Sequence, residues 1–202
     1  MNRLKTLQNL RNRYFAMRHG HSLANQQGLI VSDPRNGVDG YGLSPRGREQ
    51  VENSISNAGL DGQPMRIVSS DFRRALESAR IAHRLLDTPT ELVTDPRLRE
   101  RFFGELELGT DTAYETVWQR DAGDADHREL GVESASSVMA RVTGLVADLE
   151  ADHADETFLL VSHGDALQIL LTAFAGLDAS THRDIEHLQT AEIRALRFAS
   201  VT

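Results

Sequence analysis

The chain of 202 residues contains no cysteine. It therefore has no disulfide, no thiolate metal ligand and no cysteine nucleophile, and it fits a reducing compartment such as the cytoplasm. Aromatic residues make up only 5% of the chain, so the core should consist mainly of Leu, Val, Ile and Ala. No apolar run approaches the roughly 20 residues that a membrane-spanning helix needs, so no membrane contact is expected.

Positive charge is also scarce, with 22 Lys and Arg against 30 Asp and Glu and a formal net charge of −8. General nucleic-acid binding needs a basic face and is therefore not expected. Anionic small molecules are not excluded, because a few arginines in a cleft can dominate the local potential. Residues 1–13 are an exception, since they carry four basic residues and no acidic one. This basic N-terminal extension is expected to form a short helix before the first strand rather than a targeting peptide.

The length predicts a single domain over residues 1–202. Short apolar runs predict strands at residues 14–18, 65–68, 91–94, 157–162 and 191–198. Periodic apolar positions and cap residues predict helices at residues 22–27, 44–59, 72–86, 134–151 and 165–175. This alternation predicts an α/β fold, a three-layer α/β/α sandwich with a mainly parallel central sheet and helices on both faces.

Three connecting features are less regular. Asp71 is expected to cap the helix over 72–86. The glycine-rich segment 28–42 is expected to be a long loop, with even weight given to a substrate-facing flap and to a surface connector. Residues 121–129 are acidic and are expected to be solvated.

Arg18, His19 and Gly20 follow the first predicted strand directly. Polar residues at the carboxyl end of a strand lie where open α/β sheets form their ligand crevices. Arginine offers a rigid fork of donors for phosphate or carboxylate, and histidine can serve as nucleophile, base or metal ligand. Glycine allows a sharp turn or a close backbone approach. The tripeptide is therefore a candidate site, although alone it is weak evidence.

A second histidine, His163, follows the predicted strand 157–162 in the same way, and Arg74 begins the helix after another strand. Because parallel strands end at a common edge of the sheet, Arg18, His19, Arg74 and His163 are expected to converge. Such a cationic cluster is costly unless it holds an anion, and phosphate accepts bidentate arginine contacts well. The sequence therefore predicts a phosphate site.

Four segments in this order carry a family resemblance, namely Tyr14–Ser22, Ser69–Ala75, Leu98–Gly104 and Val161–Gly164. Together they resemble the histidine phosphatase superfamily, in its phosphoglycerate mutase-like branch with the Arg-His-Gly motif, over nearly the whole chain. The resemblance implies a phosphoglycerate mutase-like fold, a small-molecule phosphate ester as substrate, and no metal or other cofactor.

The resemblance also implies roles for individual residues. His19 would be the nucleophile that forms a phosphohistidine, and Glu100 the general acid, in preference to Glu105, Glu107 and Asp165. The implied catalytic residues are Arg18, His19, Arg74, Glu100 and His163. The implied phosphate- and substrate-binding residues are Arg18, His21, Ser22, Asn25, Arg74, His163 and Gly164. Asn25 has an alternative role as a brace of the short helix, and Arg73 is expected to be solvated.

His21 departs from the family, which commonly has glutamate or glutamine at that position. A histidine there adds a group that titrates near neutral pH. Our hypothesis is that His21 tunes substrate choice or pH dependence.

The expected activity is metal-independent hydrolysis of phosphate monoesters. A mutase is the nearest alternative, but the short cap-like insertion over residues 105–133 should leave the site open to water. A non-catalytic phospho-ligand-binding module is less favoured, because the nucleophile and the acid are both present. A zinc hydrolase using His19 and His21 is disfavoured, because Arg18 and Arg74 would repel a dication. The physiological substrate and the oligomeric state stay open.

Overall fold

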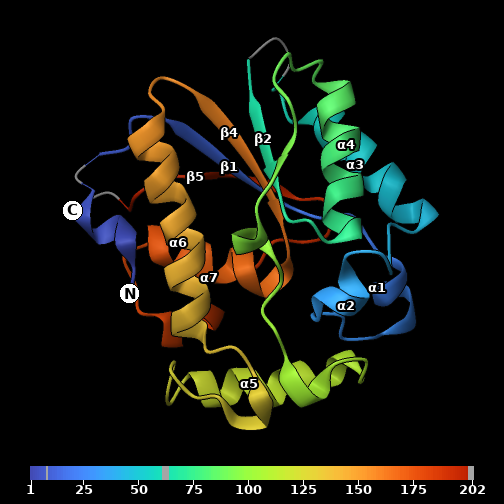
Figure 1. The fold of residues 1–202 in the computed structure, drawn as a ribbon, viewed down its shortest axis with the longest axis vertical. Coiled ribbons are helices and arrows are strands. Elements are labelled where there is room, and N and C mark those ends of the chain that lie inside the picture. Colours follow the sequence, from blue (N-terminus) through green and yellow to red (C-terminus); the bar gives the residue numbers. More distant parts are fainter. Residues whose placement is uncertain (8, 61–63, 200–202) are drawn as a thin grey trace.

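A computed structural model of the protein describes residues 1–7, 9–60 and 64–199. Its centre is a five-stranded sheet with the strand order β3-β2-β4-β1-β5 (Figure 1). The strands are β1 (Arg13–Arg18), β2 (Arg66–Ser69), β3 (Val93–Thr94), β4 (Thr157–Ser162) and β5 (Ile193–Leu196). β1 to β4 pair in parallel, and β5 runs antiparallel to β1. The predicted, mainly parallel sheet is thus confirmed. The predicted domain span of 1–202 includes residues 8, 61–63 and 200–202, which lie outside the described residues.

Helices connect and cover these strands. The α-helices are α1 (Leu23–Gln27), α2 (Pro34–Gly37), α3 (Pro45–Asn57), α4 (Arg73–Leu85), α5 (Tyr114–Asp121), α6 (Ala135–Asp152) and α7 (Gly164–Phe174). Short 3-10 helices lie at Arg3–Thr6, Pro96–Leu98, Gly104–Leu106, Asp111–Ala113, Glu129–Gly131 and Ala179–Asp184. The helix expected within the basic extension is the first of these short ones.

The strand β4 explains why helices cover both faces of the sheet. All six of its residues are buried. Because side chains alternate along a strand, Phe158 and Leu160 join the core under α6 and α7, whereas Leu159 and Val161 join the core under α3 and α4 (Figure 1). Two layers of helices thus enclose the sheet, and the predicted three-layer sandwich is confirmed.

Parallel pairing brings the carboxyl ends of three strands together. Arg18 at the end of β1 pairs with Ser162 in β4, and Ser69 in β2 pairs with Val161. The next residues of each strand therefore emerge at one edge. The segment 105–133, here called the cap, lies beyond this edge and carries α5 (Figure 1).

The glycine-rich segment 28–42 is not a plain loop, because it contains α2. Asp33 is the N-cap, its side chain accepts a hydrogen bond from Arg35 N, and Pro34 occupies the first helical position. The segment is also fastened to the cap, since Ser32 N and Oγ donate to Glu107 at 2.7 and 2.6 Å. The expectation of a loop without secondary structure was wrong here, although Asp33-Pro34 is a start signal for a helix.

Asp71 does not cap α4. The N-cap is Phe72, which makes no side-chain cap hydrogen bond. Asp71 instead accepts from Arg99 Nε at 2.8 Å. Asp71 thus pairs with Arg99, 28 residues later in the sequence, instead of capping the helix next to it. A local sequence pattern does not reveal such a partner.

The expectation that residues 121–129 are solvated was wrong for Asp121. Its side chain is fully buried and accepts from both Nη atoms of buried Arg101, at 2.6 and 2.8 Å. His127 and His182 lie against the same carboxylate at 2.9 and 3.0 Å. The cap is therefore anchored to the body of the protein through a buried charge.

Candidate active site

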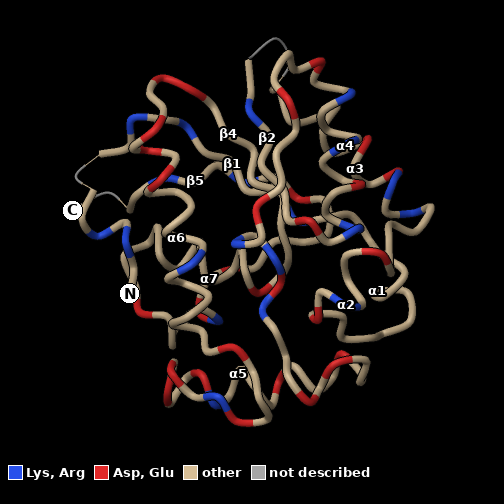
Figure 2. The backbone as a smooth tube through the Cα atoms, viewed as in Figure 1, with Lys and Arg blue, Asp and Glu red and all other residues tan. Residues whose placement is uncertain are grey.

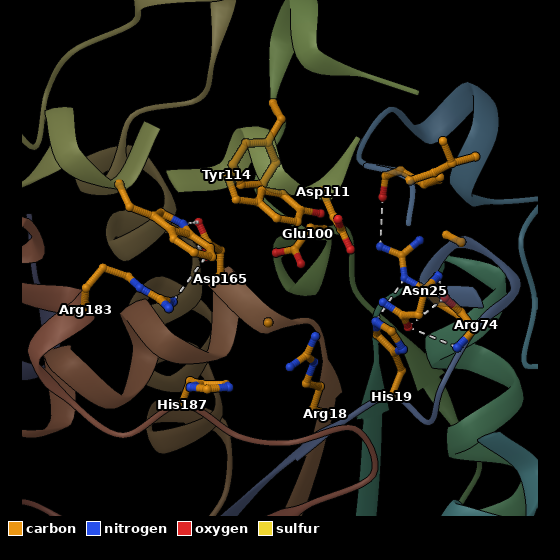
Figure 3. A pocket seen from close by; sticks show the side chains of 17 residues that line it. Arg18, His19, Asn25, Arg74, Glu100, Asp111, Tyr114, Asp165, Arg183 and His187 are labelled. Carbon is orange, nitrogen blue, oxygen red and sulfur yellow. Dashed lines mark hydrogen bonds and ion pairs between the residues drawn. The ribbon is translucent and has the colours of Figure 1, made fainter. Parts of the chain in front are cut away.

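A cavity of about 320 Å³ lies between the carboxyl edge of the sheet and the cap (Figure 3). Seven of the predicted site residues line it: Arg18, His19, Ser22, Asn25, Arg74, Glu100 and Gly164. Further lining residues that the sequence did not indicate as substrate contacts are Asp111, Tyr114, Trp118, Asp165, Arg183 and His187. Leu29 and Val31 bring the segment 28–42 to the cavity wall, as expected of a substrate-facing flap.

His19 is buried at 3% exposure, and both of its ring nitrogens are engaged. Nδ1 lies 2.8 Å from the carbonyl oxygen of Gly20, which can only accept, so Nδ1 carries the proton. Nε2 therefore carries the lone pair, and it accepts from Arg74 Nε at 3.1 Å. The nucleophilic nitrogen of this tautomer faces the arginine.

Three buried nitrogen atoms of this cluster have no hydrogen-bond partner among the described residues. They are Arg18 Nε, Arg74 Nη1 and His163 Nδ1. Other nitrogens hold the two guanidinium groups in place, since Arg18 Nη1 donates to Leu188 O at 2.9 Å and Arg74 Nη2 donates to Val31 O at 2.9 Å. Arg18 and Arg74 line the cavity, whereas His163 lies behind its wall. Buried polar groups are normally paired, so the unpaired arginine donors at the cavity indicate a site for an anion.

His163 packs behind His19, with ring centroids 5.1 Å apart. It is fully buried, and its Nε2 lies 2.8 Å from Ser70 Oγ. That hydroxyl accepts from Phe72 N and can give its own proton to Nε2, which leaves the proton of neutral His163 on the unpaired Nδ1. Ser70 thus orients His163, a role that the sequence did not indicate.

The electrostatics favour neutral histidines beside positive arginines. Burial lowers the pKa of His19 well below its usual value, and the charges of Arg74 and Arg18 lower it further. Burial likewise lowers the pKa of His163, with Arg74 again the next cause. The acidic excess of the chain lies instead along the cap around α5 (Figure 2). The net charge of −8 is therefore compatible with a cationic floor of the cavity.

Glu100 occupies the opposite side of the cavity and is 9% exposed. Its Oε1 accepts from Arg101 N at 2.9 Å and from Ala166 N at 3.2 Å. Burial raises the pKa of Glu100, and the negative charge of Asp165 raises it further, whereas Arg74 lowers it. A carboxyl with a raised pKa is suited to donate a proton. Glu107, which the sequence offered as another candidate for the general acid, instead accepts a hydrogen bond from Ser32 Oγ.

Asn25 braces the short helix α1 and also lines the cavity. Ser22 is the N-cap of α1, and its Oγ and N both donate to Asn25 Oδ1, at 2.9 and 3.0 Å. The amide oxygen is therefore occupied, while the amide nitrogen of Asn25 is the group that can donate to a ligand. The alternative role of Asn25 as a brace holds together with its place in the cavity wall.

His21 does not line the cavity. Its Nδ1 lies 2.9 Å from Oγ of Ser44, the N-cap of α3, and its backbone N donates to Gln50. The predicted role of His21 in substrate binding thus has no contact to support it. Gly20 approaches α3 closely, since a Cβ there would collide with the carbonyl oxygen of Gly47. The close approach expected of this glycine is to a helix rather than to a ligand.

Within the part of the chain that the structure describes, no group of three or more His, Asp or Glu side chains is placed to hold a metal ion. The described helices also include none that is both long and apolar enough to cross a bilayer.

Comparisons with known proteins agree with this geometry. The family model of the histidine phosphatase superfamily (branch 1) matches residues 14–201. The chain is 31% identical to "Probable phosphoglycerate mutase GpmB" of Proteus mirabilis over 178 residues, covering 84% of this chain and 77% of that protein. It is 32% identical to the glucosyl-3-phosphoglycerate phosphatase of Mycolicibacterium vanbaalenii over 183 residues, covering 82% and 75%.

Solved structures show the same likeness. A mycobacterial glucosyl-3-phosphoglycerate phosphatase in complex with VO3 superposes with a TM-score of 0.75 at 26% identity, covering 91% of this chain and 90% of that one. The α-ribazole phosphatase of Shigella flexneri gives a TM-score of 0.69 at 26% identity, covering 91% and 89%. The motifs, the fold and these relatives together establish that the chain belongs to branch 1 of the histidine phosphatase superfamily.

Proposed function

We propose that this protein is a metal-independent phosphatase that hydrolyses small phosphate monoesters through a phosphohistidine on His19. The observation that carries the proposal is the arrangement around His19 Nε2. His19, Arg18 and Arg74 line the cavity, and each of the two arginines has an unpaired buried nitrogen. His163 does not line the cavity but packs against His19 and carries a third unpaired nitrogen, Nδ1. A phosphoryl group is the anion that could accept from the arginine donors and also react with the lone pair of His19 Nε2.

In the first step, His19 Nε2 attacks phosphorus, a nitrogen–phosphorus bond forms, and the bond from phosphorus to the ester oxygen breaks. The arginines stabilise the charge on the phosphoryl oxygens. Glu100 gives its proton to the departing oxygen, so the alcohol leaves neutral. The proton on His19 Nδ1 stays hydrogen-bonded to Gly20 O, which supports the positive charge that develops on the ring.

In the second step, the Glu100 carboxylate takes a proton from water as the water oxygen attacks phosphorus. The nitrogen–phosphorus bond breaks, inorganic phosphate leaves, and His19 returns to its neutral form. Two easier steps thus replace one difficult one, and Glu100 recovers its proton for the next cycle.

A mutase would instead return the phosphoryl group to another hydroxyl of the substrate. One of the relatives is named as a phosphoglycerate mutase and another as a phosphatase, so family membership does not separate the two. The short cap favours water as the acceptor. Measuring released phosphate and isomerised phosphoglycerate in the same reaction tests the choice directly.

The central experiment is hydrolysis of p-nitrophenyl phosphate in excess chelator by wild type and by His19→Ala. We expect activity in the wild type that chelator does not remove and that is lost in the variant. Activity that survives in His19→Ala would show that His19 is not the nucleophile, and loss of wild-type activity with chelator would show that a metal is required. Acid-labile labelling of wild type, but not of His19→Ala, by a ³²P-labelled substrate would identify the intermediate.

A further inference from the structure

Glu100 and Asp165 are interlocked through their chain neighbours. Glu100 Oε1 accepts from the backbone N of Ala166, the residue after Asp165, at 3.2 Å. In return Arg101, the residue after Glu100, approaches Asp165 Oδ2 with Nη1 at 3.5 Å. The two carboxyl groups are thus held beside each other at the cavity wall, on separate elements. The reaction steps described above give Asp165 no part.

Asp165 also holds the cap. Trp118, on α5, donates from Nε1 to both carboxylate oxygens of Asp165, at 3.0 and 3.1 Å. The guanidinium of Arg183 lies 3.7 Å above the centre of the Trp118 ring and 3.9 Å from Asp165 Oδ1 (Figure 3). Asp165 itself is only 4% exposed. The indole of Trp118 and the guanidinium groups of Arg101 and Arg183 thus surround a buried carboxylate.

We propose that Asp165 is a positioning residue of the reaction, whose carboxylate fixes Trp118 over the cavity and places a negative charge beside the Glu100 carboxyl. This inference rests on the proposed function, since it acts through Glu100 as general acid. Asp165 is not itself the acid, because Trp118 and the guanidinium of Arg101 occupy its oxygens.

The charge of Asp165 acts against several other groups that face Glu100. The charge of Arg74, on α4, and the backbone N–H groups of Arg101 and Ala166 favour the ionised form of Glu100. Tyr114, on α5, lies near Glu100 (Figure 3). Burial and the negative charge of Asp165 oppose ionisation and together raise the pKa of Glu100. Without the charge of Asp165, the effects of Arg74 and of the two backbone N–H groups would be less opposed, so the pKa of Glu100 would fall and Glu100 would lose its proton at a lower pH.

The test is Asp165→Asn, which keeps the shape and an oxygen for Trp118 but removes the charge. Two substrates are compared across pH: glycerol phosphate, whose alkoxide leaves poorly and needs the acid, and p-nitrophenyl phosphate, whose leaving group needs it little. We expect the basic limb of kcat for glycerol phosphate to move down by about one pH unit, the size that one nearby charge typically produces. The activity toward p-nitrophenyl phosphate should change much less.

Two further variants separate charge from position. Asp165→Glu keeps the negative charge and should leave the basic limb where it lies in wild type. Trp118→Phe removes the indole donor and keeps the charge, so it should raise KM for glycerol phosphate without moving the limb. Asp184→Asn removes an exposed carboxylate beside Arg183 and serves as the charge-matched control. Thermal melts of each variant show whether the fold is retained.

The outcomes distinguish this inference from the proposed function. Glu100→Gln should lower glycerol phosphate hydrolysis strongly; if it does not, Glu100 is not the acid and the proposed function is wrong in that step. If Glu100→Gln has its effect while folded Asp165→Asn leaves the basic limb unmoved, the charge inference alone is overturned. If Asp165→Asn does not fold, the other two variants decide. A basic limb that moves in Asp165→Glu would overturn the role of the Asp165 charge. An unchanged KM in Trp118→Phe would overturn the role of Asp165 in holding Trp118 over the cavity.

Discussion

Arg74 donates from Nε to His19 Nε2 at 3.1 Å, so the nitrogen that we propose attacks phosphorus is engaged by an arginine of the same site. Nη2 of the same guanidinium is fixed to Val31 O, and Nη1 has no partner among the described residues. A phosphoryl group entering the cavity would compete for the Nε donor. Its binding would thus free the lone pair of His19 at the moment when the substrate is in place.

The first prediction concerns this contact. Arg74→Lys replaces a planar fork by a single ammonium and should lower kcat/KM for p-nitrophenyl phosphate by about 10²–10³-fold, the typical loss when a charge-stabilising donor is removed. Arg73→Lys is the matched control, because the neighbouring Arg73 is half exposed and pairs with Glu77 on the surface. Similar losses in the two variants would contradict the assignment of Arg74 to the phosphate site.

The second prediction concerns stability and pH. His19 and His163 are buried with pKa values well below 6.5, so the unfolded chain binds more protons than the folded one once the pH falls below about 6.5. Their contribution to stability is therefore present above pH 6.5 and is lost as the pH falls. Each histidine can remove up to about 1.4 kcal/mol per pH unit in that window.

Urea unfolding of wild type and His163→Gln at pH 7.5, 6.5 and 5.5 measures this effect. The free energy of unfolding of the variant should depend less on pH between 6.5 and 5.5 than that of wild type. Identical slopes would mean that His163 is not buried in its neutral form.

The third prediction concerns the buried pair of Arg101 and Asp121. Burial alone would raise the pKa of Asp121, but hydrogen bonds from His182 and Arg101 lower it to about 2, so the carboxylate is ionised at neutral pH. Asp121→Asn leaves the fully buried guanidinium of Arg101 with Asp165, at 3.5 Å, as its one remaining carboxylate partner among the described residues, beside the Glu133 carbonyl. We expect a loss of about 3–5 kcal/mol in the free energy of unfolding.

The control for this pair is Glu52→Gln. It breaks the ion pair between Glu52 and Arg84, whose side chains are 50% and 65% exposed, and it should cost less than about 1 kcal/mol. If chemical denaturation gives equal losses for the buried and the exposed pair, the anchoring of the cap through Asp121 is wrong.

The fourth prediction concerns the close approach of Gly20 and His21, the residues after His19, to α3. A Cβ on Gly47 would collide with the carbonyl oxygen of His21. Gly47→Ala should therefore lower the free energy of unfolding by about 1–3 kcal/mol, and it should also reduce activity by displacing His19. Gly123→Ala, where a Cβ meets no described atom closer than 3.6 Å, should leave activity unchanged. Full activity of Gly47→Ala would show that the motif tolerates movement of its backbone.

Much of the fold follows from local patterns. The apolar run in β4 indicates a buried strand. Ser44 and Ser134 are N-cap residues, and the observed helices α3 and α6 begin at the residue after each of them. Because parallel strands share an edge, the position of His19 and His163 directly after β1 and β4 was enough to predict that they meet. The distance of 5.1 Å between their rings confirms that convergence.

The cap side of the cavity could not be predicted in this way. Trp118 and Arg183 are 65 positions apart and meet because α5 and the 179–184 helix pack together, for which no periodicity gives a signal. His21 was expected near the substrate, yet the turn after Gly20 directs its ring to Ser44. The sequence places Asp121 in an acidic run that was expected to be solvated, whereas the structure buries it against Arg101.

The order of residues along this chain is therefore sufficient for the strands, the helices that follow them and the cationic floor of the cavity, because each depends on short-range periodicity and on one topological rule. The cap side of the cavity depends on ion pairs and ring stacking between residues far apart in the sequence. The packing of the folded chain determines which residues meet there. Charge and hydrogen-bond complementarity between distant segments, absent from any local window, places Asp165 beside Glu100 and the cap over the site.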